Sequence, residues 1–240
     1  MSTLLQQQDP QFVKSTFTAI AARYDFANHL LSGGLDYYWR FRVARLGARH
    51  AQQRILDLAT GSGDLAIALK KACPAASVTA ADFCLPMLAQ AQRKGVPSLV
   101  QADALALPFA DASFDLVTVA FGLRNMADWK AAVLEMRRVL VDGGHLIVLD
   151  FSLPENPAIL SIYRYYLHHV LPRIAGALTR SKDAYQYLGE SIESFPRGLS
   201  MNALLRSCGF HCEPSRAMTL GIVTVYCGMA IGPGGVNLQS

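Results

Sequence analysis

The 240-residue sequence predicts an α/β fold built on a doubly wound, mostly parallel sheet of seven strands. N-terminal helices precede the sheet, and a helical insertion follows its fifth strand. Three observations predict this architecture. Apolar runs alternate with helical patterns along residues 54–151, as in βαβ units. The first run ends in a Gly-rich turn, ILDLATGSGD at 55–64, that leads at once into a helical pattern. Acidic residues close the second and third runs, at the edge where such sheets bind ligands.

The alternating part of the chain is expected to hold five strands and three helices. The strands are expected at 54–59, 77–81, 98–101, 114–120 and 145–151, and the helices at 64–72, 86–94 and 128–140. Asp64 stands in a good capping position for the first helix, Pro86 opens the second, and Asp128 starts the third. Gly143 and Gly144 turn the chain into the fifth strand.

The remaining segments complete one domain of residues 1–240. Its expected parts are a helical cap (1–51), a cofactor-binding core (52–151), a helical lid (152–200), and a final helix with strands (201–231). In the cap, a first helix places Phe12, Phe17, Ile20 and Ala21 on one face, and a second helix runs from 36 to 49.

The lid segment breaks the strand–helix alternation and concentrates aromatic side chains. It holds five of the nine tyrosines, Tyr163, Tyr165, Tyr166, Tyr185 and Tyr187. These either line a substrate cavity or fill the core between the insertion and the sheet, because aromatic rings do both. Beyond the lid, the sequence from 209 to 230 is expected to form two strands joined by a turn.

Composition argues against several classes of protein. The net charge of +4 is spread out without a Lys/Arg block, so a nucleic-acid binder is not expected. Neither a signal peptide nor an apolar run of the ~18 residues that a membrane span needs is recognised. Five scattered cysteines are typical of reduced cytosolic thiols. Cys208 and Cys212 flank His211 but lack the second ligand pair of a zinc site, so no metal is expected.

Glycines and carboxylates at the strand ends predict a nucleotide-like ligand. Gly61 and Gly63 let the backbone turn tightly and approach a bound molecule. Asp82 ends the second strand 21 residues after Gly61, where a carboxylate can accept both ribose hydroxyls. Asp103 ends the third strand, where it can accept from an exocyclic amine such as that of adenine. Asp57 lies inside the first strand and is expected to help bind the ligand. The alternative is a buried carboxylate that bonds turn amides, with a lowered pKa, and both roles are compatible because such a carboxylate could fix the glycine loop.

These acidic positions bear on the choice of cofactor. Asp82 alone does not discriminate between cofactors, because a nicotinamide-dependent dehydrogenase would also use it, and a plain turn residue is the alternative. The third acidic position, Asp103, together with Asp57, is more typical of S-adenosylmethionine binding than of NAD binding.

Further motifs, spread over residues 17–228, narrow the choice of family. They are Tyr24-Asp25-x-x-Asn28-x-Leu30-Leu31-Ser32, Trp39-Arg40, Asp57-Leu58-Ala59-x-Gly61-x-Gly63-Asp64, Ala102-Asp103-Ala104, Gly122-Leu123-Arg124-Asn125 and Tyr187-Leu188-x-Glu190-Ser191-Ile192. In these motifs the sequence resembles the class I S-adenosylmethionine-dependent methyltransferases. Within that class it resembles the C-methyltransferases of quinone biosynthesis, which act on demethylmenaquinol and on a ubiquinol precursor. The resemblance implies a Rossmann-like fold and S-adenosylmethionine as the cofactor.

The resemblance also implies which residues hold the cofactor. Its contacts fall on Ser62, Asp82, Asp103 and Ala104, beside Asp57, Gly61 and Gly63 of the glycine loop. The family often has Ser before Phe121, where this chain has Ala120. Any cofactor contact at that position is therefore expected from the backbone alone.

Catalysis is expected from Arg124, Asn125 and Tyr24, again by resemblance. The family proposal gives the arginine a general-base role through water, but a guanidinium with a pKa above ~12 is a poor base. We expect Arg124 instead to stabilise the quinolate oxyanion, with water or Tyr24 relaying the proton and Asn125 orienting the water. His168 and His169 are alternative bases, because the pKa of an imidazole suits that task.

The expected function is S-adenosylmethionine-dependent C-methylation of a prenylated quinol, from demethylmenaquinol to menaquinol. A 2-polyprenyl-6-methoxy-1,4-benzoquinol of ubiquinone biosynthesis, or another small acceptor, is the alternative substrate. An NAD-dependent oxidoreductase and a non-catalytic cofactor-binding partner are the alternatives of other classes. The protein is expected to be cytoplasmic, to contact the membrane surface transiently, and to bind no nucleic acid; a homodimer is left open.

Overall fold

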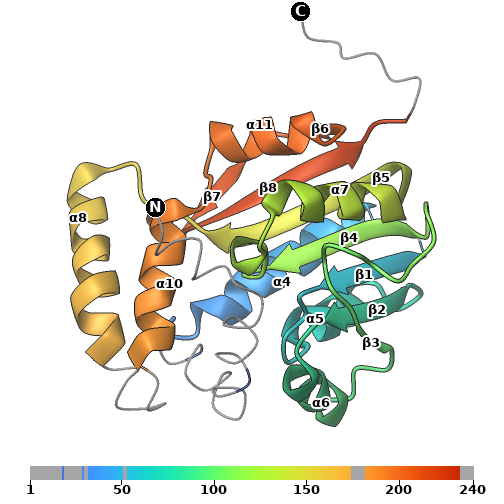
Figure 1. The fold of residues 1–240 in the computed structure, drawn as a ribbon, viewed down its shortest axis with the longest axis horizontal. Coiled ribbons are helices and arrows are strands. Elements are labelled where there is room, and N and C mark those ends of the chain that lie inside the picture. The colour runs from blue at the N-terminus through green and yellow to red at the C-terminus, as the bar shows by residue number, and fades with distance from the viewer. Residues whose placement is uncertain (1–17, 19–28, 30–31, 51–52, 174–181, 233–240) are drawn as a thin grey trace, which may run out of the picture.

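A computed structural model describes residues 18, 29, 32–50, 53–173 and 182–232, which form a mostly parallel sheet flanked by helices (Figure 1). The strands are β1 (Arg54–Leu58), β2 (Ser77–Asp82), β3 (Leu99–Gln101), β4 (Phe114–Ala120), β5 (Leu140–Phe151), β6 (Phe210–Cys212), β7 (Arg216–Met218) and β8 (Val223–Ala230). The α-helices are α4 (Leu35–His50), α5 (Asp64–Ala72), α6 (Leu85–Arg93), α7 (Trp129–Val139), α8 (Pro157–Tyr165), α10 (Lys182–Ser194) and α11 (Leu199–Ser207). Short helical turns are η2 (Leu123–Asn125), η3 (Tyr166–Val170) and η4 (Thr219–Gly221).

The strand order places a ligand crevice at one edge of the sheet. The strands pair in the order β3-β2-β1-β4-β5-β8-β6, and β7 also pairs with β8. The first five run parallel, and β8 lies antiparallel to its three neighbours. The chain order reverses between β1 and β4, and open α/β sheets bind ligands beyond the carboxyl ends of the strands at such a switch point.

The predicted doubly wound fold is confirmed, with two local corrections. The sheet has eight strands rather than seven, because the first of the two strands expected between 209 and 230 is divided into β6 and β7, which both pair antiparallel with β8. Asp64 does not cap α5. The N-cap is Gly63, whose φ is +86°, and Lys94 binds the Asp64 carboxylate at 2.6 Å. By contrast, Asp128 caps α7 as predicted, accepting from the backbone N–H of Ala131 at 2.9 Å.

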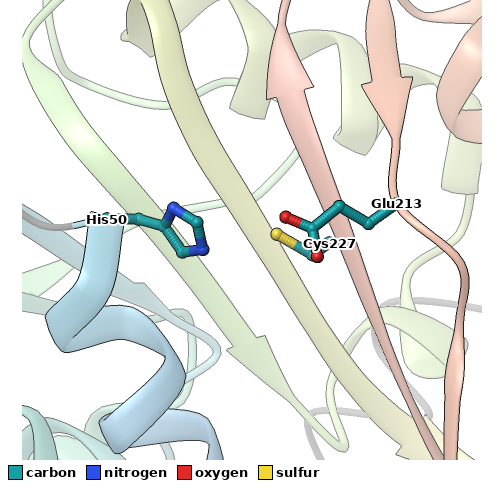
Figure 2. Close-up of side chains that lie close together, drawn as sticks. All are labelled: His50, Glu213 and Cys227. Atoms are coloured by element: carbon teal, nitrogen blue, oxygen red, sulfur yellow. The ribbon is translucent and has the colours of Figure 1, made fainter.

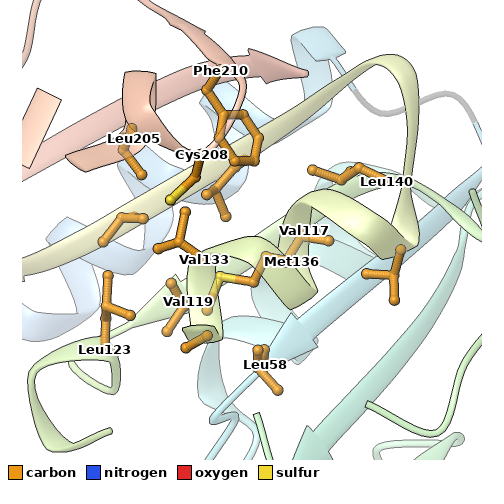
Figure 3. Close-up of a cluster of buried hydrophobic side chains, with 14 of the residues drawn as sticks. Leu58, Val117, Val119, Leu123, Val133, Met136, Leu140, Leu205, Cys208 and Phe210 are labelled. Atoms are coloured by element: carbon orange, nitrogen blue, oxygen red, sulfur yellow. The ribbon is translucent and has the colours of Figure 1, made fainter. Parts of the chain in front are cut away.

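Two hydrophobic layers fill the space between the sheet and its helices. Helices α7 and α11 cover one face, where Val133 and Leu205 pack with the strand residue Val119 (Figure 3). Helices α4 and α5 cover the other face, where Val43 and Leu69 pack with the buried strands. Because parallel strands are buried on both faces, their sequences are nearly continuous apolar runs.

The insertion forms a helical layer at one end of the sheet. Figure 1 shows α8 and α10 side by side there, and Arg164 of α8 binds Glu193 of α10 at 2.8 Å. The insertion has its own buried cluster, which includes Tyr163, Leu167 and Ile192. Among the described residues, no helix combines the length and the hydrophobicity needed to cross a bilayer.

Some predicted features lie outside the described residues. They are the first cap helix with Phe12, Phe17, Ile20 and Ala21, the candidate Tyr24, and the side chain of Tyr185.

Candidate active site

A pocket opens at the carboxyl ends of β1, β2, β3 and β4. It encloses about 870 Å³ of empty space, its open mouth included. Of the predicted site residues it brings together Gly61, Asp82, Asp103, Ala104 and Asn125. Strand ends far apart in sequence therefore meet around one ligand-sized space.

The first wall of the pocket is the turn after β1. Gly61 has a φ of +57°, a conformation that favours glycine. Its backbone N–H donates to Asp82 Oδ2 at 2.8 Å, so the carboxylate of β2 fixes the glycine turn of β1. The second oxygen of Asp82 accepts from the N–H of Cys84 at 2.9 Å.

The Asp82 carboxylate has capacity left for a ligand. Burial raises the pKa of Asp82, and the N–H groups of Cys84, Gly61 and Phe83 oppose that rise. A carboxylate offers about four acceptor sites, so these three N–H groups leave acceptor capacity for a ligand. That capacity suits a ribose hydroxyl.

The second acidic group stands across the pocket from the glycine turn. Asp103 is exposed, and its Oδ1 accepts from the N–H of Leu105 at 2.9 Å. A backbone bridge joins Asp103 to Ala106 and holds the loop that carries Ala104. Asp103 and Ala104 both line the pocket, as the adenine-binding interpretation requires.

Two residues at the strand ends have unusual backbone conformations. Ala59 after β1 has a φ of +52° and Phe121 after β4 a φ of +59°. Non-glycine residues in this region cost about 1 kcal/mol or more, and such strain gathers at ligand sites. Both residues line the pocket. A Cβ on Gly122 would lie 2.4 Å from Ala59 Cβ, so the two turns approach closely only because position 122 is glycine.

Three predicted cofactor residues lie behind the pocket wall rather than on it. Asp57 is buried in β1 and accepts from the hydroxyls of Thr60 at 2.6 Å and Thr118 at 2.8 Å. The alternative interpretation of Asp57, a carboxylate bonded to turn amides, is therefore wrong. The lowered pKa that it implied is also wrong, because burial raises the pKa of Asp57 to about 6.

The other two residues behind the wall belong to the end of the glycine loop. Ser62 is buried, and its Oγ accepts from the Lys94 amine at 2.9 Å. A Cβ on Gly63 would lie 2.6 Å from a methyl of Val96 and 3.0 Å from Ala91 Cβ. Gly63 thus allows α5 to pack against the end of α6. Neither residue lines the pocket, so their cofactor contacts stay predictions.

Arg124 is held in a buried ion pair next to the pocket. Its side chain is 5% exposed, and Nη1 donates to Asp150 Oδ1 at 2.8 Å and to the Phe121 carbonyl. The guanidinium carbon lies 5.2 Å from the centre of the Phe151 ring. Among the described residues, Nε of Arg124 is a buried donor without a hydrogen-bond partner. Arg124 does not itself line the pocket. No signal in the sequence indicated that this predicted catalytic residue would be buried behind the wall.

Asn125 lines the pocket and joins it to the helical insertion. Its Nδ2 donates to the Phe121 carbonyl at 3.3 Å, and its Oδ1 accepts from the Tyr187 hydroxyl at 3.1 Å. Tyr187 is 6% exposed, and burial raises its pKa, so the phenol keeps its proton and donates at neutral pH. The positive charge of Arg124 opposes that rise. The sequence did not predict that Tyr187 bonds Asn125. The signal that could have found this residue is the motif Tyr187-Leu188-x-Glu190-Ser191-Ile192.

The alternative bases lie elsewhere. His168 and His169 are exposed on η3 and do not line the pocket, and His168 Nε2 lies 3.6 Å from Glu193. Tyr163 is buried in the insertion core and Tyr165 is 61% exposed. These two tyrosines do not line the pocket either.

Apolar residues form much of the remaining wall, and most of them were not predicted as site residues. They are Leu58, Phe83, Cys84, Met87, Ala102, Leu105, Ala120, Phe121, Met126 and Ala127. Ala120 presents only a methyl group where the family often has a hydroxyl. The signal that could have found these residues is their position directly at the ends of the strands.

One group of metal-ligand types occurs in the described part of the chain. The ligand atoms of His50, Glu213 and Cys227 lie within 4.8 Å of one another, and Figure 2 shows the three side chains facing each other. Arg216 binds the Glu213 carboxylate at 3.1 Å and offsets its charge. His50 also stacks on His145 at 4.0 Å, near the start of the β4–β5 pairing and away from the pocket. We assign no metal to this group.

The comparisons with known proteins agree with this geometry. Residues 3–230 match the model of the ubiE/COQ5 methyltransferase family. The chain belongs to this family. The family resemblance seen in the sequence is thereby confirmed, and with it the prediction of a methyltransferase.

Relatives from bacteria are similar over nearly their whole length. A demethylmenaquinone methyltransferase of Thermus thermophilus is 46% identical over 88% of this chain and 98% of its own. One of Deinococcus radiodurans is 41% identical over 93% of this chain and 94% of its own. A ubiquinone/menaquinone biosynthesis C-methyltransferase of Syntrophotalea carbinolica is also 41% identical, over 93% and 96%.

Among solved structures, a SAM-dependent methyltransferase of Thermotoga maritima has a similar fold. Its TM-score is 0.62 at 16% identity, covering 90% of this chain and 99% of its own. At that identity the similarity concerns the fold, which is the predicted class I methyltransferase fold.

Proposed function

We propose that this protein transfers the methyl group of S-adenosylmethionine to a ring carbon of demethylmenaquinol and so forms menaquinol. The observation that carries the proposal is the meeting of Gly61, Asp82 and Asp103 with Asn125 around one pocket. The names of the Thermus and Deinococcus relatives support demethylmenaquinol as the acceptor. Names of other relatives keep the benzoquinol as the alternative acceptor.

The residues of the pocket fit the donor. The acceptor capacity that Asp82 has left suits a ribose hydroxyl, and Oδ2 of Asp103, whose Oδ1 accepts from Leu105, suits the adenine amine. A nicotinamide cofactor would use Asp82 but would leave Asp103 without a role. When bound, S-adenosylmethionine supplies a methyl group that its sulfonium already makes electrophilic.

The chain must orient the acceptor and raise the nucleophilicity of its ring carbon. Alignment of two reactants can contribute several of the ~7–11 kcal/mol that well-oriented reactions gain. Deprotonation of a quinol hydroxyl pushes charge into the ring, so the site needs a proton acceptor and a partner for the oxygen anion. The ring carbon then gains the methyl, loses its own proton and regains aromaticity, and S-adenosylhomocysteine leaves.

We assign the anion-stabilising role to Arg124 and the orienting role to Asn125. Asp150 holds the guanidinium in place, and the buried Nε–H of Arg124 has donor capacity left among the described residues. Tyr187 orients Asn125 through its hydroxyl. A water oriented by Asn125, or Tyr24, relays the proton; Tyr24 lies outside the described residues.

A prenylated quinol resides in the lipid bilayer. We therefore propose a cytoplasmic protein that contacts the membrane surface transiently to reach its substrate. A homodimer stays an open prediction.

The test is a competition between acceptors. The protein is incubated with methyl-labelled S-adenosylmethionine and equal amounts of short-chain demethylmenaquinol and its benzoquinol counterpart, both kept reduced. We expect label predominantly in the naphthoquinol. Label in neither quinol, with S-adenosylmethionine still bound, would contradict the proposed acceptor class.

A further inference from the structure

Helix α4 presents an outward surface of aromatic and basic side chains, which we name the α4 outer face. It consists of Tyr37, Tyr38, Phe41, Arg42, Arg45 and Arg49, all exposed. The rings are 57%, 45% and 52% exposed in that order. Large exposed rings gathered on one helix are unusual in a protein surface that meets only water.

The arrangement within this face is specific. Arg42 lies over the Tyr38 ring at 5.6 Å and donates to the Tyr38 hydroxyl at 2.7 Å. Arg45 lies over the Phe41 ring at 5.8 Å. Two of the three rings therefore carry a cation beside them, the combination that suits the headgroup layer of an anionic bilayer.

Helix α4 carries no acidic side chain on this face that could neutralise the three arginines. Its one acidic residue, Asp36, is buried and binds Arg40, His29 and Ser32. The three arginines of the outer face thus keep a net positive charge of their own. Its complement is an anionic surface, and the rings add an apolar component that a purely ionic partner does not need.

Helix α4 also borders the pocket. From its inner side, Trp39 packs against Phe121 at 5.9 Å between ring centres, and Arg40 lies over the same ring at 5.5 Å. Phe121 lines the pocket. A surface that rests on α4 therefore lies next to the wall of the site.

We propose that the α4 outer face docks the protein on an anionic lipid bilayer, with the rings in the headgroup layer and the arginines on lipid phosphates. The inference rests on the proposed function only for its purpose, which is to bring the pocket to a prenylated quinol. Docking itself depends on the six side chains. A nucleic acid is the other polyanion to consider, but the positive charge here is one short face with three rings rather than a long basic stripe.

The test measures sedimentation with vesicles of phosphatidylcholine containing phosphatidylglycerol, and with phosphatidylcholine alone. The face variant is Arg42→Gln/Arg45→Gln/Arg49→Gln. Its partition coefficient on anionic vesicles should fall about 100-fold, since each basic residue near such a surface contributes about 1 kcal/mol. A ring variant, Tyr37→Ser/Phe41→Ser, should fall about 10-fold.

A control variant removes the same number of charges elsewhere. It is Arg93→Gln/Lys130→Gln/Arg206→Gln, whose side chains are exposed on α6, α7 and α11. We expect its vesicle binding to stay within about 2-fold of the original protein. Circular dichroism verifies that all variants fold.

The outcomes separate docking from chemistry. Equal losses in the face and control variants would show a net-charge effect and overturn the proposal. Equal binding to neutral and anionic vesicles would overturn it as well. So would a face variant that loses binding to duplex DNA, measured in parallel, but keeps its binding to anionic vesicles. Methyl transfer to a water-soluble short-chain quinol should be unchanged in the face variant. If the protein binds vesicles through this face but transfers no methyl group to any quinol, the docking surface stands and the proposed function fails.

Discussion

Asp82→Asn should weaken S-adenosylmethionine binding more than any other single change of the same size. Both carboxylate oxygens already accept a backbone N–H, from Gly61 at 2.8 Å and from Cys84 at 2.9 Å. An asparagine replaces one oxygen by an NH₂ group, which faces an N–H donor instead of accepting from it. The variant loses one charged hydrogen bond to a ribose hydroxyl, about 1.5–3 kcal/mol, so the dissociation constant should rise about 10- to 100-fold.

The assay is calorimetric titration with S-adenosylmethionine and S-adenosylhomocysteine. Asp103→Asn is the matched control, because that carboxylate is exposed and, among the described residues, accepts from the single N–H of Leu105. It should weaken binding about 5-fold, within the range of an ordinary hydrogen bond. An Asp82→Asn protein that folds and binds the donor as tightly as the original would refute the ribose assignment.

Binding should also depend on pH through Asp82. Burial raises the pKa of this carboxyl, so it takes up a proton at a higher pH than an exposed aspartate does. A protonated carboxyl accepts less well, and donor affinity should therefore fall as the pH is lowered through the raised pKa. Affinity that does not fall as the pH is lowered from 8 to the limit at which the protein stays folded would contradict the carboxylate's role.

The remaining predictions concern catalysis and stability. Tyr187→Phe, which removes the hydroxyl that bonds Asn125 at 3.1 Å, should lower kcat about 10-fold and leave donor affinity unchanged; an unchanged kcat would exclude positioning through this bond. Arg124→Lys should lower kcat at least 100-fold, because an ammonium cannot replace the guanidinium contacts to Asp150 and the anion together; near-full activity would exclude oxyanion recognition by the guanidinium. The pKa of Asp57 is about 6 when folded and about 4 when unfolded, so its buried charge costs about 3 kcal/mol above pH 6, and this cost disappears as the pH falls to 4. Denaturant titrations should therefore show the stability advantage of Asp57→Asn shrinking over that window, and a constant difference would contradict the shift. Gly63→Ala should lower the free energy of unfolding by about 3 kcal/mol, since the added Cβ would lie 2.6 Å from a methyl of Val96 and φ is +86°. A change below 1 kcal/mol would show that Val96 and the end of α6 move aside at little cost.

Local chemistry explains which parts of the site were predictable. Gly61, Asp82 and Asp103 each stand directly after an apolar run, and parallel strands bring their carboxyl ends to one edge. Turn residues and strand ends are local signals, so sequence alone places these three residues on one pocket. Asn125 follows by the same argument from the end of β4.

Long-range partners explain what was not predictable. Asp57 bonds Thr118, 61 residues away, so its surroundings could not be read from the glycine loop beside it. Arg124 bonds Asp150, 26 residues away at the end of β5, and this partner turns an expected pocket residue into a buried one. Strands β6 and β7 were expected as a single strand, because three-residue strands leave almost no periodic signal.

The measurement that tests the central claim most directly is the position of the transferred methyl group. The protein is incubated with [¹³C-methyl]-S-adenosylmethionine and reduced short-chain demethylmenaquinol, and the product is analysed by ¹³C NMR. The account predicts one labelled methyl bonded to a ring carbon, and loss of that signal in the Arg124→Lys protein. A labelled methyl on the quinol oxygen, or no labelled product from a protein that binds the donor, would contradict it.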